Sequence, residues 1–268
     1  MPERIVSPEL YSENYFMSDN EGWKEYVSGL ECNIHPKFAK ALELADVRAG
    51  DRVLDIGCGR GELVYYAVKK GARAIGIDYS EAAIGIAGKT IEKLEDRLRP
   101  LARAEVGDVV THSFTDKFSV IFMIEIAEHM YDWQLKAAFG RIKELLAPDG
   151  RLVIMTPNYY YEKYLFPIKN IMNIPFNFIK WPMRILRGKY KPKDFHELLN
   201  RIFKVKVDRG QLNRAMHVNV TTPRKLRELL SDFDIELYCD DHSKNILSLV
   251  TQRWWGREII VVAVKKRI

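Results

Sequence analysis

Three glycines that follow a short apolar stretch constrain this chain more than any other feature. Residues 53–62 read VLDIGCGRGE, and their apolar start suits a buried parallel strand. Gly57, Gly59 and Gly61 permit a sharp turn and a close approach of the backbone to a ligand. The run that begins at Glu62 has the periodicity of a helix. Strand, glycine turn and helix together predict the first unit of a nucleotide-binding α/β domain.

An acidic residue stands at the end of the next expected strand. Residues 72–77 predict this strand, and Asp78 follows it, 21 residues after Gly57. This is close to the spacing at which an acid reaches the hydroxyl groups of a ribose, and two carboxylate oxygens match two hydroxyl donors. Ser80 then suits the N-cap of a helix. We therefore expect Asp78 to bind ribose, with a surface acid in a turn as the alternative.

The spacing of the glycines and a third acidic motif point to one family. The glycines are spaced G-x-G-x-G rather than G-x-G-x-x-G, Asp55 lies within the first strand, and Asp108 and Val109 follow a strand expected at 102–106. This pattern resembles the class I S-adenosylmethionine-dependent methyltransferases. The resemblance implies that Asp108 binds the adenine amino group and that Val109 covers the ring.

The rest of the chain continues the alternation of strands and helices. We expect strands at 118–124, 151–155, 235–238 and 258–264, helices at 133–146 and 223–230, and a turn at 148–150. The resemblance implies an α/β fold with a Rossmann-like, seven-stranded sheet, mostly parallel with an antiparallel C-terminal strand. It also implies three parts: an N-terminal arm (1–45) over the cofactor, a core (46–158 and 218–268), and a helical insertion (159–217).

The resemblance also implies S-adenosylmethionine as the cofactor. The residues expected to bind it are Asp55, Gly57, Cys58, Gly59, Asp78, Tyr79, Asp108, Val109, Glu125 and Tyr15. Tyr15 is in the arm, where packing against the sheet edge is the alternative to closing over the cofactor.

The catalytic candidates lie after the fourth expected strand, where open α/β sheets place their ligands. Residues 125–130 read EIAEHM, which resembles a motif of quinone-biosynthesis O-methyltransferases, of many glycan and natural-product methyltransferases, and of small-RNA 3′-end methyltransferases. His129 has a reference pKa suited to taking a proton from an acceptor hydroxyl, and Glu128 is its expected orienting partner. A buried structural histidine is the alternative. Asn158, in a TPN triplet, either binds substrate or shapes a turn.

A metal site is an alternative to the metal-free interpretation. If a helical turn starts at Glu125, then Glu125, Glu128 and His129 lie on one face and can hold a divalent cation. His217 would be a further ligand. Some of the resembling families use a metal at this place and others do not.

The insertion differs from the rest of the chain in composition. Residues 160–215 contain 13 lysines and arginines and 4 acidic residues, a net charge of +9, against −3 for the remainder. They are also rich in aromatic side chains. Three interpretations stay open: a substrate lid, an amphipathic segment that contacts an anionic membrane, or a surface for single-stranded nucleic acid. The lack of a recognisable RNA-binding module argues against the third. A helical subdomain or subunit interface is the structural alternative.

The cysteines and the N-terminal sequence indicate where the protein is located. Three well-separated cysteines and no signal-peptide pattern predict a cytoplasmic protein, with membrane association left open.

The expected function is methyl transfer from S-adenosylmethionine to an oxygen of a small-molecule or lipid-like acceptor. RNA as acceptor, a metal-dependent reaction and a reaction other than methyl transfer are the alternatives. A nucleotide-binding oxidoreductase and a non-catalytic binding protein are rivals from other classes. The oligomeric state is not predicted.

Overall fold

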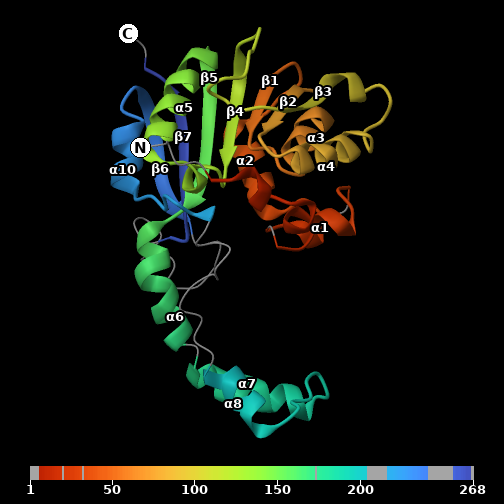
Figure 1. Ribbon diagram of the computed structural model, residues 1–268, viewed down its shortest axis with the longest axis vertical. Helices are drawn as coiled ribbons and strands as arrows, with labels where there is room; N and C mark the ends of the chain where they lie inside the picture. The colour runs from red at the N-terminus through yellow and green to blue at the C-terminus, as the bar shows by residue number, and fades with distance from the viewer. Residues whose placement is uncertain are drawn as a thin grey trace.

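One seven-stranded sheet forms the centre of the molecule. The computed structural model describes residues 6–19, 21–31, 33–172, 174–203, 216–240 and 256–266. The strand order is β3-β2-β1-β4-β5-β7-β6, and β7 runs antiparallel to both of its neighbours while the other pairings are parallel. The prediction of a Rossmann-like, mostly parallel sheet is therefore confirmed (Figure 1).

The strands follow the apolar runs of the sequence. Their bounds are β1 Arg52–Ile56, β2 Arg73–Asp78, β3 Ala102–Val106, β4 Phe118–Ile124, β5 Leu146–Pro157, β6 Phe233–Asp240 and β7 Glu258–Lys265. Strands β4 and β5 lie at the centre of the sheet, and side chains such as Ile121 and Ile154 are fully buried. Because both faces of a central parallel strand are covered, a continuous apolar run is what such a position requires.

Helices cover both faces of the sheet. The core on one face includes residues of α2 (Pro36–Ala45), α3 (Glu62–Lys69) and α4 (Glu81–Ile91), and the core on the other includes α5 (Asp132–Leu145) and α10 (Pro223–Leu229). Hydroxyl caps begin two of these helices: Ser80 accepts from the backbone N–H of Ala83, and Thr222 accepts from that of Lys225. These two helices thus start where a capping hydroxyl follows a strand or loop, whereas α3 begins after Gly61 without a side-chain cap.

The prediction of a turn at 148–150 is wrong. Strand β5 begins at Leu146, which pairs with Phe118, and the ladder resumes at Arg151, which pairs with Val120. Residues 147–150 form an irregularity inside the strand. Gly150 makes this close path feasible, because a Cβ there would lie 2.9 Å from the carbonyl oxygen of Phe118.

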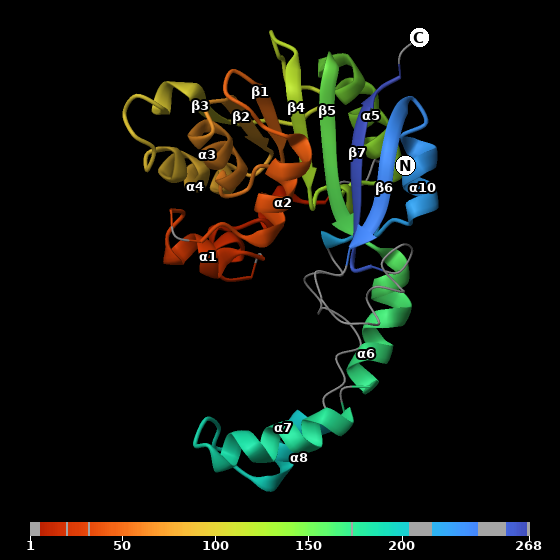
Figure 2. The same cartoon turned by 180° about the vertical axis from the view of Figure 1, so that it is seen from behind.

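Two segments extend the core. The arm contains α1 (Trp23–Ser28) and α2, and it lies beside the ends of β1 and β4 (Figure 1). The insertion starts with a π-helical turn, Tyr161–Leu165, and continues through α6 (Phe166–Met172), α7 (Ile174–Leu186) and α8 (Phe195–Phe203), as the prediction of a helical insertion required. These helices project away from the sheet (Figure 2). Among the described residues, no helix has the length and apolar character needed to cross a membrane.

Candidate active site

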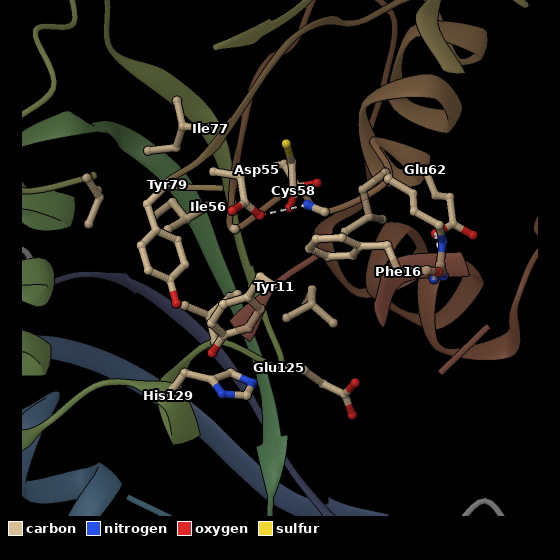
Figure 3. Close-up of a pocket in the computed structure, with 18 of the residues that line it drawn as sticks. Tyr11, Phe16, Asp55, Ile56, Cys58, Glu62, Ile77, Tyr79, Glu125 and His129 are labelled. Atoms are coloured by element: carbon tan, nitrogen blue, oxygen red, sulfur yellow. Dashed lines mark hydrogen bonds and ion pairs between the residues drawn. The ribbon is translucent and has the colours of Figure 1, made fainter. Parts of the chain in front are cut away.

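A cavity of about 320 Å³ opens at the carboxyl ends of the parallel strands. Asp55 comes from β1, Asp78 from the end of β2, and Glu125 from the residue after β4. Figure 3 shows several of these side chains converging with residues of the arm. All the residues predicted to bind the cofactor line this cavity, and so does His129, whereas Glu128 is buried behind it.

The glycine turn brings the backbone to the wall of the cavity. Gly57 has a φ of 69°, and a Cβ at this position would lie 2.0 Å from Cδ1 of Ile126. The backbone N–H groups of Gly57 and Cys58 both donate to the carbonyl oxygen of Ile77, at 2.8 and 3.0 Å. Any side chain at Gly57 would therefore meet both a strained backbone and an occupied space. The Cys58 thiol is buried, and burial raises its pKa well above the usual value, which fits a packing role.

Asp78 is held in a fixed orientation at the end of β2. Its carboxylate accepts hydrogen bonds from the backbone N–H groups of Gly59, at 3.0 Å, and Ser80, at 2.9 Å. Burial raises the pKa of Asp78, although these backbone donors oppose the shift. Burial also raises the pKa of Asp55 well above its usual value, with a further contribution from the charge of Asp78. Asp78 is thus the better-stabilised anion of the two.

Asp108 and Val109 lie at the side of the cavity, after β3. Val109 is buried, whereas Asp108 is exposed at the edge and accepts a hydrogen bond from the backbone N–H of Val110 at 2.8 Å. Tyr79, after β2, is 36% exposed. An apolar wall with a carboxylate beside it is an arrangement that suits a planar ring with an amino group.

Arg60 ties the arm to the glycine turn. It is almost fully buried and donates to the carbonyl oxygens of Phe16, at 2.8 Å, and Glu21, at 2.9 Å, and it pairs with Glu62. The sequence pattern does not reveal this role, because the partners of Arg60 are backbone atoms some 40 residues away in the chain. The arm therefore forms one wall of the cavity through a defined set of bonds.

Lys37 is the centre of a cluster of charged side chains, called here the lysine cluster, which the sequence does not reveal. Its buried ammonium group pairs with Glu21 at 3.2 Å, with Glu258 at 3.5 Å, and with Glu125. Burial opposes the charge on Lys37, but the three carboxylates outweigh it and hold the pKa of Lys37 above its usual range. Arg257 also pairs with Glu21, at 3.0 Å. This network joins the arm, α2, the end of β4 and the start of β7 beside the cavity.

His129 is neutral and oriented. Its Nδ1 lies 3.0 Å from the carbonyl oxygen of Met216, which can only accept, so the proton sits on Nδ1. Burial lowers the pKa of His129, although Met216 and Glu125 oppose the shift. Nε2 is then the unprotonated nitrogen, and it lies 4.0 Å from Glu128, too far for a hydrogen bond. The Met216 carbonyl, rather than Glu128, orients the ring.

Glu128 is buried beneath His129. Its carboxyl group accepts a hydrogen bond from the Thr156 hydroxyl at 3.0 Å. Burial, with a contribution from the charge of Glu125, raises the pKa of Glu128 to about 8. Glu128 is therefore mostly protonated at neutral pH.

The helical turn on which the metal alternative depends does not start at Glu125. A 3₁₀ turn spans Ala127–His129, and Glu125 has a φ of 56°, in the left-handed region. This backbone points Glu125 to Lys37, so its carboxylate belongs to the lysine cluster. Glu128, His129 and His217 instead bring their ligand atoms within 4.8 Å of one another. His217 therefore joins the predicted pair, and Glu125 does not.

Two tyrosines of the arm reach the cavity. The Tyr11 ring lies between those of Tyr79 and His129, with centroid distances of 5.3 and 5.6 Å (Figure 3). Tyr15 packs on Tyr11, with ring centroids 5.6 Å apart. The buried Tyr11 hydroxyl is near that of Tyr79 without the geometry of a hydrogen bond. Burial raises the pKa of Tyr11 far above its usual value, so the phenol keeps its proton and is available as a donor.

Asn158 shapes the backbone rather than the cavity. It is fully buried, and its side chain donates to the carbonyl oxygen of Gly256 at 2.9 Å and accepts from the backbone N–H of Tyr160 at 3.1 Å. Of the two roles expected for Asn158, the structure therefore supports the turn.

Known proteins with similar sequences are methyltransferases. The family model described as a methyltransferase domain matches residues 26–239. The chain is 32% identical over 143 residues to (S)-coclaurine N-methyltransferase of Thalictrum flavum subsp. glaucum, covering 47% of this chain and 38% of that protein. It is 31% identical over 122 residues to a ubiquinone biosynthesis O-methyltransferase of Pseudomonas fluorescens, covering 45% of this chain and 50% of that protein. The alignments thus span half or less of these relatives.

Solved structures of methyltransferases share the fold. The N-methyltransferase NodS of Bradyrhizobium japonicum, in complex with S-adenosyl-L-homocysteine, aligns with a TM-score of 0.54 and 15% identity over 95% of this chain and 93% of that chain. The glycopeptide N-methyltransferase MtfA, complexed with S-adenosyl-L-methionine, aligns with a TM-score of 0.52 and 12% identity over 86% of this chain and 87% of that chain. The sheet order, the glycine turn and the match to the family model agree, and the chain belongs to the S-adenosylmethionine-dependent methyltransferases.

Proposed function

We propose that this protein transfers a methyl group from S-adenosylmethionine to an oxygen of a small-molecule or lipid-like acceptor, with His129 taking the proton of the acceptor hydroxyl. The observation that carries this proposal is the state of His129. Its proton is on Nδ1, toward the carbonyl oxygen of Met216, and its Nε2 is unprotonated in a side chain that lines the cavity. A lowered pKa keeps this base neutral at physiological pH.

The residues around the cavity fit the cofactor. Gly57 and Gly59 have positive φ angles, so the turn presents backbone where side chains would block a ligand. Asp78 supplies a buried, oriented carboxylate for two hydroxyl groups, and Val109 supplies an apolar wall. When bound, S-adenosylmethionine supplies an electrophilic methyl group on a sulfonium.

The reaction needs positioning and one proton acceptor from the protein. Nε2 of His129 accepts the hydroxyl proton as the acceptor oxygen becomes nucleophilic, and the imidazolium that forms is stabilised by the carbonyl oxygen of Met216. Tyr11, which keeps its proton, is available as a hydrogen-bond donor beside His129. Tyr11, Tyr15 and Phe16 of the arm line the cavity. Exclusion of water by the arm would favour a step in which an anionic oxygen and a sulfonium lose their charges.

Metal-dependent methyl transfer to a hydroxyl is the second candidate. The ligand atoms of Glu128, His129 and His217 lie close enough together to hold one divalent cation. Such a cation would lower the pKa of an acceptor hydroxyl, and Glu128 would release its proton on binding it. The two candidates differ in one measurable property, the response to a chelator.

The test uses labelled S-adenosylmethionine and fractionated cell extracts, with and without chelator. We expect label in an extractable small-molecule or lipid fraction, and activity that persists with chelator. His129→Asn should lower turnover by about 10²–10⁴-fold and leave cofactor affinity within a few-fold. His196→Asn, at an exposed position of α8, is the matched control.

Four results would change the proposal. Label in RNA would make RNA the acceptor, and loss of activity with chelator would favour the metal-dependent reaction. Consumption of the cofactor without methylated product would indicate another reaction of the same fold. Turnover by His129→Asn close to that of the unaltered protein would remove His129 as the base.

A cytoplasmic location stays a prediction from the cysteines.

A further inference from the structure

Helix α7 has two faces with different surroundings. Its inner face packs on α8 and the loop before it: Asn177 donates to the carbonyl oxygen of Ile202 at 3.1 Å, and Phe178 meets Phe203 with ring centroids 5.3 Å apart. Trp181 meets Tyr190 at 5.0 Å. These contacts account for the side of the helix that is turned toward α8.

The opposite side of α7 exposes large apolar side chains in one stripe. The stripe, called here the outer face, consists of Phe176 (69% exposed), Ile179 (64%), Met183 (41%) and Leu186 (86%). Their spacing of three, seven and ten residues from the first places them on one side of a helix. Exposing four such side chains together to water is unfavourable, which indicates a surface that is covered when the protein functions.

Basic residues flank the outer face. Lys180 and Arg184 lie over the Trp181 ring, at 5.7 and 5.3 Å from its centroid, and they and Arg187 are exposed. Between residues 160 and 203 there are nine lysines and arginines and three acidic residues. An apolar stripe bordered by lysine and arginine is the pattern of a helix that lies in the surface of an anionic membrane.

We propose that the outer face of α7 binds the surface of an anionic phospholipid bilayer, with the helix parallel to the membrane plane. The apolar side chains enter the boundary between head groups and acyl chains, to a depth of about 5–10 Å. Lys180, Arg184 and Arg187 contact the lipid phosphates. The projection of α7 and α8 from the core leaves room for this contact (Figures 1 and 2).

Two other occupants fit the outer face less well. A second copy in a symmetric dimer would bring its own Lys180 and Arg184 against the same basic rim, and like charges repel. Single-stranded nucleic acid would match the charge, but Phe176 is the one aromatic side chain of the outer face, and Ile179, Met183 and Leu186 offer no ring on which further bases can stack. This inference concerns a surface remote from the reaction and does not depend on the identity of the acceptor.

The test is flotation of the full chain with vesicles that contain phosphatidylserine, and with vesicles of phosphatidylcholine alone. We expect binding to the anionic vesicles that weakens as salt is added. Phe176→Glu with Ile179→Glu should lower partitioning of the protein onto the vesicles at least about a hundredfold, because two apolar side chains that enter the membrane are lost. Val27→Glu, which changes a side chain 59% exposed on α1, is the matched control and should float like the unaltered protein.

A second variant separates charge from apolar contact. Lys180→Gln, Arg184→Gln and Arg187→Gln together should lower binding to anionic vesicles by about a hundredfold, at about fivefold for each residue, with no effect on neutral vesicles. Cofactor binding, measured on each variant, shows that the core is folded whether or not the methyl-transfer proposal holds. Equal flotation of Phe176→Glu/Ile179→Glu and the unaltered protein would overturn the inference. Failure of the unaltered protein to float, with self-association that this variant abolishes, would assign the face to a second copy instead.

Discussion

Several side chains beside the cavity owe their charge state to a few specific partners. Lys37 stays charged although it is buried, because three carboxylates surround it. Glu62 has Arg60 as its ionic partner, and burial outweighs that pair and raises the pKa of Glu62 to about 7. The protonation of Glu62 therefore links the stability of the arm and the glycine turn to pH.

The Glu62 carboxyl group should make stability depend on pH. Its pKa is about 7 in the folded protein and near the usual 4.5 when unfolded, so its stabilising contribution is present below 4.5 and lost as pH rises through 7. We expect Glu62→Gln to remove about 3 kcal/mol of the decrease in unfolding free energy between pH 4.5 and 8. Urea unfolding of both proteins at several pH values measures this difference. If the unfolding free energies of the two proteins fell equally with pH, the prediction would be contradicted.

Residues of the cavity differ in how far the sequence reveals them. Gly57, Asp78 and Asp108 stand at fixed distances from strands that the apolar pattern locates, so their place at the cavity could be predicted. Arg60 and Lys37 could not, because their roles depend on backbone and carboxylate partners that only the folded arm brings near. Long-range contacts of this kind leave no local pattern.

At the level of elements, the arm is the part that completes the cavity. Ser80 donates to the carbonyl oxygen of Tyr11 at 2.9 Å, and the Tyr26 hydroxyl lies 2.9 Å from that of Thr90. With the bonds of Arg60, these contacts fix the arm over α3 and α4. The arm is therefore expected to stabilise the bound cofactor by closing over it.

Removing the Arg60 side chain should loosen the arm. Arg60→Gln loses two hydrogen bonds from a charged group to the arm, so we expect a loss of about 3–6 kcal/mol of stability, at about 1.5–3 kcal/mol for each bond, and faster hydrogen exchange in the arm. The double variant Arg60→Gln/Glu62→Gln also removes the buried Glu62 carboxyl group, which has to take up a proton once Arg60 is gone. It should recover much of the stability but not the protection of the arm. Unchanged arm exchange in both variants would show that other contacts hold it.

Element boundaries follow the sequence where apolar runs and caps decide them. Strand β4 spans the predicted 118–124, and α4 starts behind the predicted cap Ser80. The prediction of a turn at 148–150 failed, and the helical turn considered for the metal alternative does not start at Glu125. At both places tertiary contacts set the backbone. Pairing with Phe118 draws Leu146 into the strand, and Lys37 holds Glu125 in a left-handed conformation. Neither contact is visible in the local sequence.

The whole molecule combines a dense core with a projecting set of helices. Side chains from seven strands and six α-helices fill the two cores, whereas α7 has no buried residue and α8 buries Ile202. The predicted division into arm, core and insertion remains an interpretation of this arrangement. A helical pair with so little buried apolar surface gains little stability from the core.

Hydrogen exchange should separate these two parts of the molecule. We expect the amides of α7 and α8 to exchange through local opening at a free energy well below that of β4 and β5, because few apolar contacts are lost on opening. Exchange in the presence of anionic vesicles should slow in α7 and stay unchanged in β4. Equal protection of α7 and β4 without vesicles would contradict the view of a loosely attached insertion.

The central claim is that the glycine turn and Asp78 hold the nucleoside of S-adenosylmethionine. Titration calorimetry with S-adenosylhomocysteine tests it most directly, with Asp96→Ala, at an exposed acid far from the cavity, as the control. We predict saturable binding by the unaltered protein and by the control. Asp78→Ala should lower the affinity at least about tenfold, as expected for loss of hydrogen bonds to a charged group. No binding by the folded protein, or equal affinity of Asp78→Ala, would contradict the claim.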